Sequence, residues 1–124
     1  LVGSEMCIRD RVVCDYYSGM QVLVPLDLKL AGTTAGQVAE GIAAYYKDGA
    51  TVSVHALNEP LPENGLYSNA LSGSDRMELY LTVNAAGDQM MLISLFDNLG
   101  KGSSGAAVQC MNLMLGLNET EGLE

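Results

Sequence analysis

The sequence is poor in positive charge: 6 lysine and arginine residues stand against 15 aspartate and glutamate residues, for a formal net charge of −9. Nucleic acids and anionic membrane surfaces bind proteins through clustered basic side chains, so an acidic chain is not expected to bind either. No apolar stretch approaches the roughly 20 residues that a membrane-spanning helix needs. The sequence therefore predicts no nucleic-acid partner and no membrane partner.

Cysteine and histidine are also scarce. Cys7, Cys14 and Cys110 are odd in number and widely spaced, which argues against a disulfide framework or a zinc site and predicts a reducing, cytoplasmic location. Cys110 falls inside a helical pattern, where a thiol is expected to behave as a small buried hydrophobe. His55 is the only histidine, and nothing in the sequence places it beside a thiol as a nucleophile–base pair requires. We expect it to be a surface or half-buried strand residue, and we expect no catalytic and no metal-binding residue in this chain.

What the chain does have is apolar residues, 48% of its 124 positions, which predicts one folded domain with a core. The first eleven residues, LVGSEMCIRDR, follow neither the helical nor the strand period and resemble a translated sequencing adapter. We expect residues 1–11 to be a non-native leader, with an ordinary polar leader as the alternative. Fold reasoning therefore starts at Val12.

Hydrophobic periodicity along the rest of the chain predicts an α+β fold. The sheet is expected to be mixed and mostly antiparallel, with helices on one face. Glu78, Tyr80 and Thr82 are expected on the outward face of their strand, with Asp75 and Glu78 at a solvated strand end. The expected elements are a strand over Met20–Leu30 at a sheet edge because of Pro25, a helix from a Thr34–Gln37 capping box to about Lys47, a strand over Thr51–Leu57, a loop over Asn58–Asn69, a strand over Arg76–Asn84, a central strand over Gln89–Phe96 and a helix over Ala106–Leu115 ended by Gly116.

A glycine-rich loop, residues 98–105, joins the last strand to the last helix. A strand that feeds such a loop into a helix presents several backbone N–H groups and the positive end of the helix dipole to one point. The order of residues differs from a phosphate-binding P-loop, and the GxGxxG spacing of Gly100, Gly102 and Gly105 follows the last strand instead of the first. The pattern leaves two interpretations open, a helix cap and a contact for an anion or cofactor.

Residues 95–116, LFDNLGKGSSGAAVQCMNLMLG, resemble the C-terminal signature of the N-acetyl-gamma-glutamyl-phosphate reductase family, which reads DNLxKGASGxAVQNxNLMxG. Further likeness lies in Ser18-Gly19-Met20, in Leu57 to Pro60 and in Gly73-Ser74-Asp75, and it covers roughly Val12 to Leu123. The resemblance implies a fold of the glyceraldehyde-3-phosphate and semialdehyde dehydrogenase type. It also implies an NADP-dependent oxidoreductase of arginine and amino-acid biosynthesis that reduces an acyl phosphate to a semialdehyde.

The resemblance further implies that the chain is the C-terminal part of a longer enzyme whose N-terminal Rossmann domain is missing. Residues 12–97 then correspond to a partial catalytic and dimerisation domain, which forms a homo-oligomer through its sheet. Residues 98–124 correspond to a glycine-rich loop and a helix that pack on the Rossmann domain. The residues expected near the nicotinamide end of the cofactor are Asn98, Lys101, Gly102, Ser103, Ser104 and Gly105.

The chain departs from the family in ways that bear on activity. No cysteine has the family's Pro-Gly-Cys context, and His55 does not match the family's histidine, so the chain alone is expected to be inactive. Ser18 stands where the family often has arginine, and Cys110 where it usually has asparagine. The alternative interpretation is a free-standing α+β module that binds a small anion or only mediates dimerisation.

Overall fold

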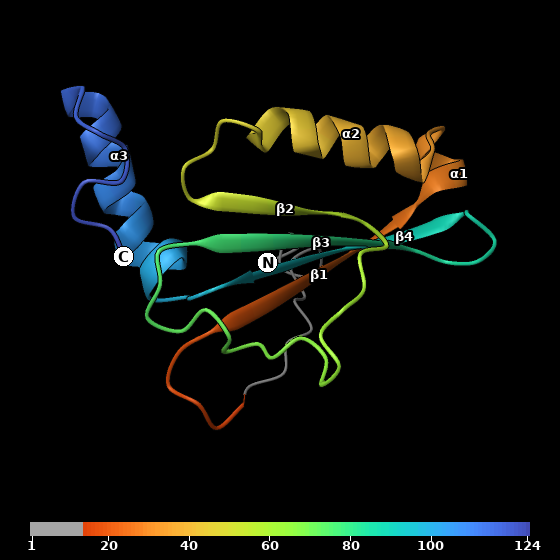
Figure 1. Ribbon diagram of the computed structural model, residues 1–124, viewed down its shortest axis with the longest axis horizontal. Helices are drawn as coiled ribbons and strands as arrows, with labels where there is room; N and C mark the ends of the chain where they lie inside the picture. Colours follow the sequence, from red (N-terminus) through yellow and green to blue (C-terminus); the bar gives the residue numbers. More distant parts are fainter. Residues whose placement is uncertain (1–13) are drawn as a thin grey trace, which may run out of the picture.

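The computed structural model describes residues 14–124, so the expectation of a non-native leader at residues 1–11 lies outside the described part of the chain. Strands and helices follow one another in the order that the sequence predicts, with a short helix and a π-helical turn added (Figure 1). The elements are β1 (Met20–Asp27), α1 (Leu28–Ala31), α2 (Ala35–Tyr46), β2 (Val52–Leu57), β3 (Met77–Val83), β4 (Gln89–Phe96), a π-helical turn η2 (Gly100–Ser104) and α3 (Gly105–Leu115).

The strands form one four-stranded sheet in the order β1-β4-β3-β2. β4 is antiparallel to both of its neighbours, whereas β2 and β3 are parallel, so the prediction of a mixed, mostly antiparallel sheet is confirmed. β4, whose sequence is apolar on both faces, is a central strand that pairs with β1 and with β3. Both of its faces pack against other parts of the chain, which explains its apolar sequence. Pro25 lies in the edge strand β1, where a missing N–H donor costs least.

The first strand ends earlier than its alternating pattern predicts. Asp27 stops it: its carboxylate Oδ1 accepts the N–H of Leu30 at 2.9 Å and so caps the short helix α1. Gly32, at φ 65°, ends this helix in the left-handed region. The turn leaves Leu28 only 2% exposed in the core, so the prediction that the strand continues to Leu30 is wrong.

Helix α2 covers one face of the sheet, as predicted (Figure 1). Thr34 caps its start through a capping box, in which the Thr34 hydroxyl accepts the Gln37 N–H and the Gln37 side chain accepts the Thr34 N–H. The side chains that α2 turns to the sheet pack on a buried cluster from α1, β3 and β4. That cluster is Leu28, Leu81 and Met90, with Val38, Ala39 and Ile42 from α2.

The opposite face of the sheet is covered by the segment 58–76, which connects β2 to β3. Leu66 and Leu71 from this segment pack on Tyr80, Ile93 and Leu95. Tyr80 is 7% exposed, so the face expected to point outward is covered here and not open to solvent. Alternation correctly placed Tyr80 on this opposite face, which is the second face of the sheet. The alternation gave no sign that a loop rich in proline and asparagine covers that face.

Helix α3 lies beyond the strand ends rather than over the sheet (Figure 1). It ends at Gly116, at φ 68°, whose N–H reaches back to carbonyls of the last turn, as predicted. Cys110 on this helix is exposed, so the expectation of a buried thiol is wrong. Within residues 14–124, no helix is long and apolar enough to cross a membrane.

Candidate functional site

Three segments meet at one end of the sheet: residues 18–19, 72–75 and 97–105. They converge because β1 and β3 begin where the antiparallel β4 ends. The Gly19 N–H donates to Asn98 Oδ1 at 2.8 Å, and the hydroxyls of Ser18 and Ser72 hydrogen-bond to each other. The predicted glycine-rich loop is therefore one of three parts of a polar junction.

Asp97 is the centre of this junction and is only 3% exposed. Its carboxylate accepts the backbone N–H of Leu99 at 2.8 Å and that of Gly73 at 2.5 Å. Burial by itself would raise the pKa of Asp97, but the amides of Gly73, Leu99 and Gly100 and the hydroxyl of Ser18 outweigh it and hold the pKa below its ordinary value. Asp97 therefore stays ionised and ties the loop to the other two segments.

Close packing explains the three glycines of the loop. A Cβ on Gly105 would lie 1.9 Å from Asp75 Oδ1, and one on Gly100 would lie 2.7 Å from the Ser74 carbonyl oxygen. A Cβ on Gly102 would lie 2.9 Å from the ring of Phe96. A side chain at any of the three forces a neighbour to move, so their spacing serves contact within the domain.

The backbone of the loop forms the π-helical turn η2 and uses its own amides. The Gly102 N–H donates to the Asp97 carbonyl at 2.8 Å, and the Ser104 N–H donates to the Leu99 carbonyl at 3.0 Å. The Gly105 N–H donates to the Gly100 carbonyl. Amides that already have a carbonyl partner are not free to cradle a phosphate, which supports the helix-cap interpretation for this part of the loop.

Lys101 turns inward from the same loop. Its ammonium Nζ donates to Thr51 Oγ1 at 2.7 Å and to Gln109 Oε1, and the Gln109 amide in turn donates to the Glu119 carboxylate. Burial lowers the pKa of Lys101, while Glu119 and Asp75 raise it in part. This lysine therefore connects η2 to the start of β2 and to α3.

The outward side of the turn consists of Gly102, Ser103 and Ser104, which are all exposed. The Ser104 hydroxyl donates to the Leu99 carbonyl at 2.7 Å. Of the six predicted site residues, the structure thus places three on the surface of the turn and uses the side chains or backbone of Asn98, Lys101 and Gly105 inside the junction.

The residues after α3 fold back against the start of β3. The Asp75 N–H donates to the Glu124 carbonyl at 2.7 Å, and the Glu124 N–H donates to Asp75 Oδ2 at 3.1 Å. Asn112, 2% exposed, holds the same residues through its amide, which donates to the Glu121 carbonyl at 2.8 Å. Asp75 is therefore a hydrogen-bonded packing residue, and the prediction of a solvated strand end at this position is wrong.

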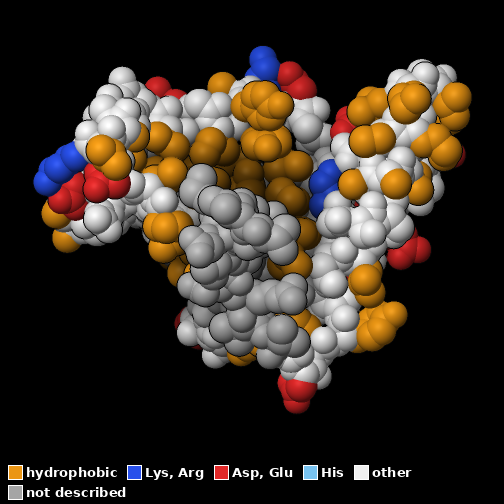
Figure 2. Space-filling view, turned by 180° about the vertical axis from the view of Figure 1, so that it is seen from behind, with side chains coloured by type: hydrophobic (Ala, Val, Ile, Leu, Met, Phe, Trp, Pro, Cys, Tyr) orange, Lys and Arg blue, Asp and Glu red, His pale blue; other side chains and the backbone are white. Residues whose placement is uncertain are grey.

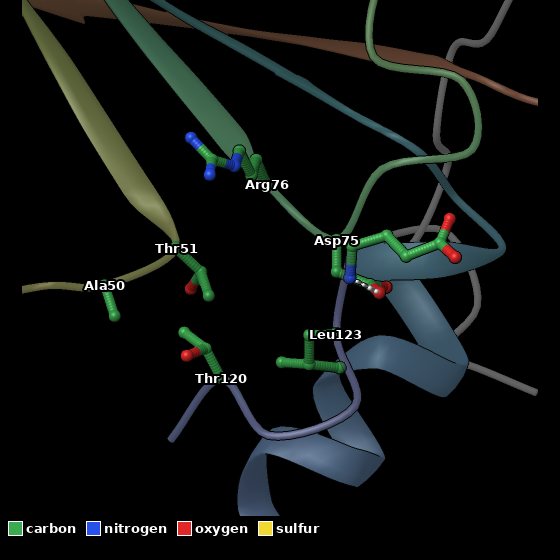
Figure 3. A pocket seen from close by; sticks show the side chains of 7 residues that line it. Ala50, Thr51, Asp75, Arg76, Thr120 and Leu123 are labelled. Carbon is green, nitrogen blue, oxygen red and sulfur yellow. Dashed lines mark hydrogen bonds between the residues drawn. The ribbon is translucent and has the colours of Figure 1, made fainter. Parts of the chain in front are cut away.

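A small cavity of about 50 Å³ lies inside this fold-back. Figure 3 shows Thr51 at the start of β2, Asp75 and Arg76 at the start of β3, and Thr120 and Leu123 from the returning residues around it. Its volume suits one or two water molecules and excludes a nucleotide. Sequence reasoning missed Thr51 and Gln109 as hydrogen-bond partners of Lys101, and Glu119 as the partner of Gln109. Thr51 lies 50 positions from Lys101, and no local pattern joins residues at that separation.

The exposed face of α3 is apolar. Figure 2 shows hydrophobic side chains gathered along this helix. Met114 is 86% exposed and Leu115 65%, and Leu113 and Met111 are also exposed. A helix face of this kind is typical of a surface that packs on another protein surface.

No protein-family model matches the chain. Curated relatives that carry the name N-acetyl-gamma-glutamyl-phosphate reductase do match. The protein of Burkholderia lata is 43% identical over 103 residues and that of Burkholderia orbicola 41% over 103 residues; each match covers 82% of this chain and 33% of the relative. The protein of Trichormus variabilis is 37% identical over 116 residues, which is 90% of this chain and 36% of the relative. The chain is therefore a homologue of the N-acetyl-gamma-glutamyl-phosphate reductases and spans about a third of their length.

Proposed function

We propose that this chain is the C-terminal third of an NADP-dependent N-acetyl-gamma-glutamyl-phosphate reductase, a cytoplasmic enzyme that reduces an acyl phosphate to a semialdehyde. The observation that carries the proposal is the identity of 37 to 43% to proteins of that name over most of this chain. In the complete protein the remaining two thirds supply the nucleotide-binding domain and the reacting cysteine and histidine. The chain alone is then inactive.

In this proposal the polar junction forms one wall of the cofactor pocket. Gly102, Ser103 and Ser104 face the nicotinamide end, because they lie on the exposed side of η2. Asn98, Lys101 and Gly105 keep the turn in place through their contacts inside the junction. The contact is one of shape and hydroxyl groups, since the amides of Gly102, Ser104 and Gly105 already donate to backbone carbonyls.

The apolar face of α3 then packs on the missing Rossmann domain, which the exposure of Met114 and Leu115 supports. The edge strand β1 also exposes apolar side chains, with Val22 and Val24 more than a third exposed and Leu23 54% exposed. We assign this part of the sheet to contact between subunits of a homo-oligomer. A charge at Val24, as in Val24→Lys, is expected to shift the complete protein toward smaller species in sedimentation.

A chimera tests the proposed activity. The C-terminal third of the Burkholderia lata relative is replaced by residues 12–124 of this chain, and NADPH oxidation with the acyl phosphate is measured. We expect turnover, and we expect none from the purified 124-residue chain. The intact relative is the positive control, and the same relative truncated before the junction is the negative control.

An inactive chimera that folds and oligomerises like the intact relative would contradict the proposal. Turnover by the 124-residue chain alone would contradict it as well. Calorimetric titration of the chain alone with inorganic phosphate and with NADPH distinguishes this proposal from the alternative, a free-standing anion-binding module. We expect no heat from phosphate, because Lys101 is committed to Thr51 and Gln109.

A further inference from the structure

A cluster of ionisable side chains lies on the second face of the sheet and takes no part in the proposed site. His55 in β2 stacks on the ring of Tyr80 in β3, with ring centroids 3.9 Å apart and planes inclined by 10°. The imidazole lies between two carboxylates: Nδ1 is 3.0 Å from Glu59 Oε1, and Nε2 is 3.5 Å from Glu78 Oε2. The charged and titratable groups that face His55 are therefore Glu59 from the segment after β2, and Glu78 and Tyr80 from β3.

The cluster lies where the pairing of β2 with β3 is interrupted. The ladder runs regularly to the pair Val54–Leu79, and it resumes out of register at Leu57–Leu81. His55 and Ala56 thus form a bulge in β2, and the Ala56 N–H donates to Glu59 Oε2 at 2.9 Å. Each oxygen of the Glu59 carboxylate therefore holds one residue of the bulge, and side chains replace the backbone ladder at this point.

Whether the imidazole is neutral or protonated decides whether both of its ring nitrogens have a hydrogen-bond partner. Nε2 of His55 is buried and has no hydrogen-bond partner, although it faces a carboxylate oxygen. A neutral ring that donates Nδ1–H to Glu59 presents the Nε2 lone pair to Glu78, which is repulsive. An imidazolium presents an N–H to each carboxylate and removes the repulsion.

Glu59 and Glu78 lie where each can accept a hydrogen bond from a protonated imidazole. The hydrogen bond from His55, followed by that from the Ala56 amide, lowers the pKa of Glu59 and keeps it ionised. Burial and the hydrogen bond to Glu78 raise the pKa of Tyr80 to about 12, so its hydroxyl stays protonated and donates to Glu78 Oε2 at 2.8 Å. The two carboxylates approach opposite nitrogens of the ring and do not converge on one point, and no group of metal-binding side chains occurs among residues 14–124.

We propose that His55, Glu59 and Glu78 form a proton-dependent clamp that holds the bulge of β2 against β3. The clamp tightens when the imidazole gains a proton and loosens when the proton leaves. The segment 58–76 begins at this bulge, covers the second face of the sheet through Leu66 and Leu71, and ends in the polar junction. Proton uptake at His55 thus controls how firmly that segment is anchored at its start.

His55 is the only histidine of the chain, so its imidazole C–H resonance is assigned without ambiguity in a proton NMR titration. We expect the titration midpoint to be lower in Glu78→Gln and in Glu59→Gln than in the unaltered chain, because each variant removes a negative partner of the imidazole. Tyr80→Phe keeps the stacked ring and frees Glu78 Oε2 for the imidazole, so we expect its midpoint to rise. Glu63→Gln, an exposed acid of the same segment, is the matched control and leaves the midpoint unchanged.

A second readout covers the case in which a variant folds poorly. In the unaltered chain the urea midpoint of unfolding is expected to fall as the pH rises and the imidazole loses its proton, because the folded chain then loses the cation that lies between the two carboxylates. His55→Gln is expected to lose that dependence. The proposal is overturned if the imidazole midpoint is the same in the unaltered chain, Glu59→Gln and Glu78→Gln, if it moves with Glu59 alone, or if His55→Gln keeps the pH dependence of the urea midpoint.

Discussion

Gly105 lies directly against the carboxylate of Asp75, so closely that a Cβ on Gly105 would stand 1.9 Å from Asp75 Oδ1. The same carboxylate accepts the Glu124 N–H at 3.1 Å through its other oxygen. Asp75 is therefore enclosed between the start of α3 and the residues that return from its end. This contact holds the start of α3 against Asp75, and hence also the position of η2, which directly precedes α3.

Gly105→Ala is expected to destabilise the chain by about 1 to 3 kcal/mol, because the new methyl group forces Asp75 out of its place. The matched control is Gly41→Ala in α2, where a Cβ meets nothing within 4 Å. That change is expected to stabilise the chain by about 0.5 to 1 kcal/mol, since alanine favours a helix over glycine. Urea unfolding of both variants measures the difference, and equal effects would contradict the role of Asp75.

The glycine spacing illustrates what sequence can and cannot predict. The position of the loop between β4 and α3 followed from periodicity, and so did the fold class. The reason for the glycines did not, because Asp75 is 30 residues away from Gly105 and no local rule joins them. Lys101 is a similar case: nothing local in the sequence indicates that its ammonium donates to Thr51, which lies 50 residues away.

Two departures from the sequence pattern have equally specific causes. Leu28 continued an alternating pattern, but the cap formed by Asp27 turned the chain into α1 first. Tyr80 lies on the face that alternation gave it, yet segment 58–76 covers that face. Local propensity predicted the elements well; capping by one side chain and coverage by an irregular loop decided what they bury.

Asp97→Asn is expected to destabilise the chain by about 1 to 3 kcal/mol, because an amide accepts fewer of the donors that converge there and adds donors of its own. The folded-state pKa of Asp97 lies below its ordinary value of 3.8. Its contribution is therefore complete above that value and is lost as the pH falls through the lower, folded-state pKa.

Unfolding of the unaltered chain and of Asp97→Asn at a series of pH values measures this contribution. The difference in unfolding free energy between the two is expected to be constant near neutral pH and to shrink in acid. Asp27→Asn, which alters an exposed helix cap, is the control for a general acid effect. A difference that grows in acid would contradict the assigned role of Asp97.

Lys101→Met is expected to cost about 1 to 2 kcal/mol, since the substitution keeps most of the unbranched side chain but leaves Thr51 and Gln109 without their shared donor. Lys47→Met is the matched control, because the Lys47 side chain is exposed and its ammonium lies 3.7 Å from the exposed Asp48 carboxylate. Its effect is expected to stay within about 0.5 kcal/mol. Equal losses in the two variants would show that Lys101 is not a structural connector.

The exposed apolar face of α3 is expected to make the chain self-associate when nothing else covers it. Met114→Gln removes the most exposed side chain of that face, at 86% exposure, so it is expected to weaken association while changing the unfolding free energy by less than about 0.5 kcal/mol. Leu30→Gln is the matched control, because Leu30 is 88% exposed but lies on α1, away from α3. Sedimentation velocity over a range of concentrations separates the two variants. Equal weakening by both would assign the association to hydrophobic exposure in general and not to α3.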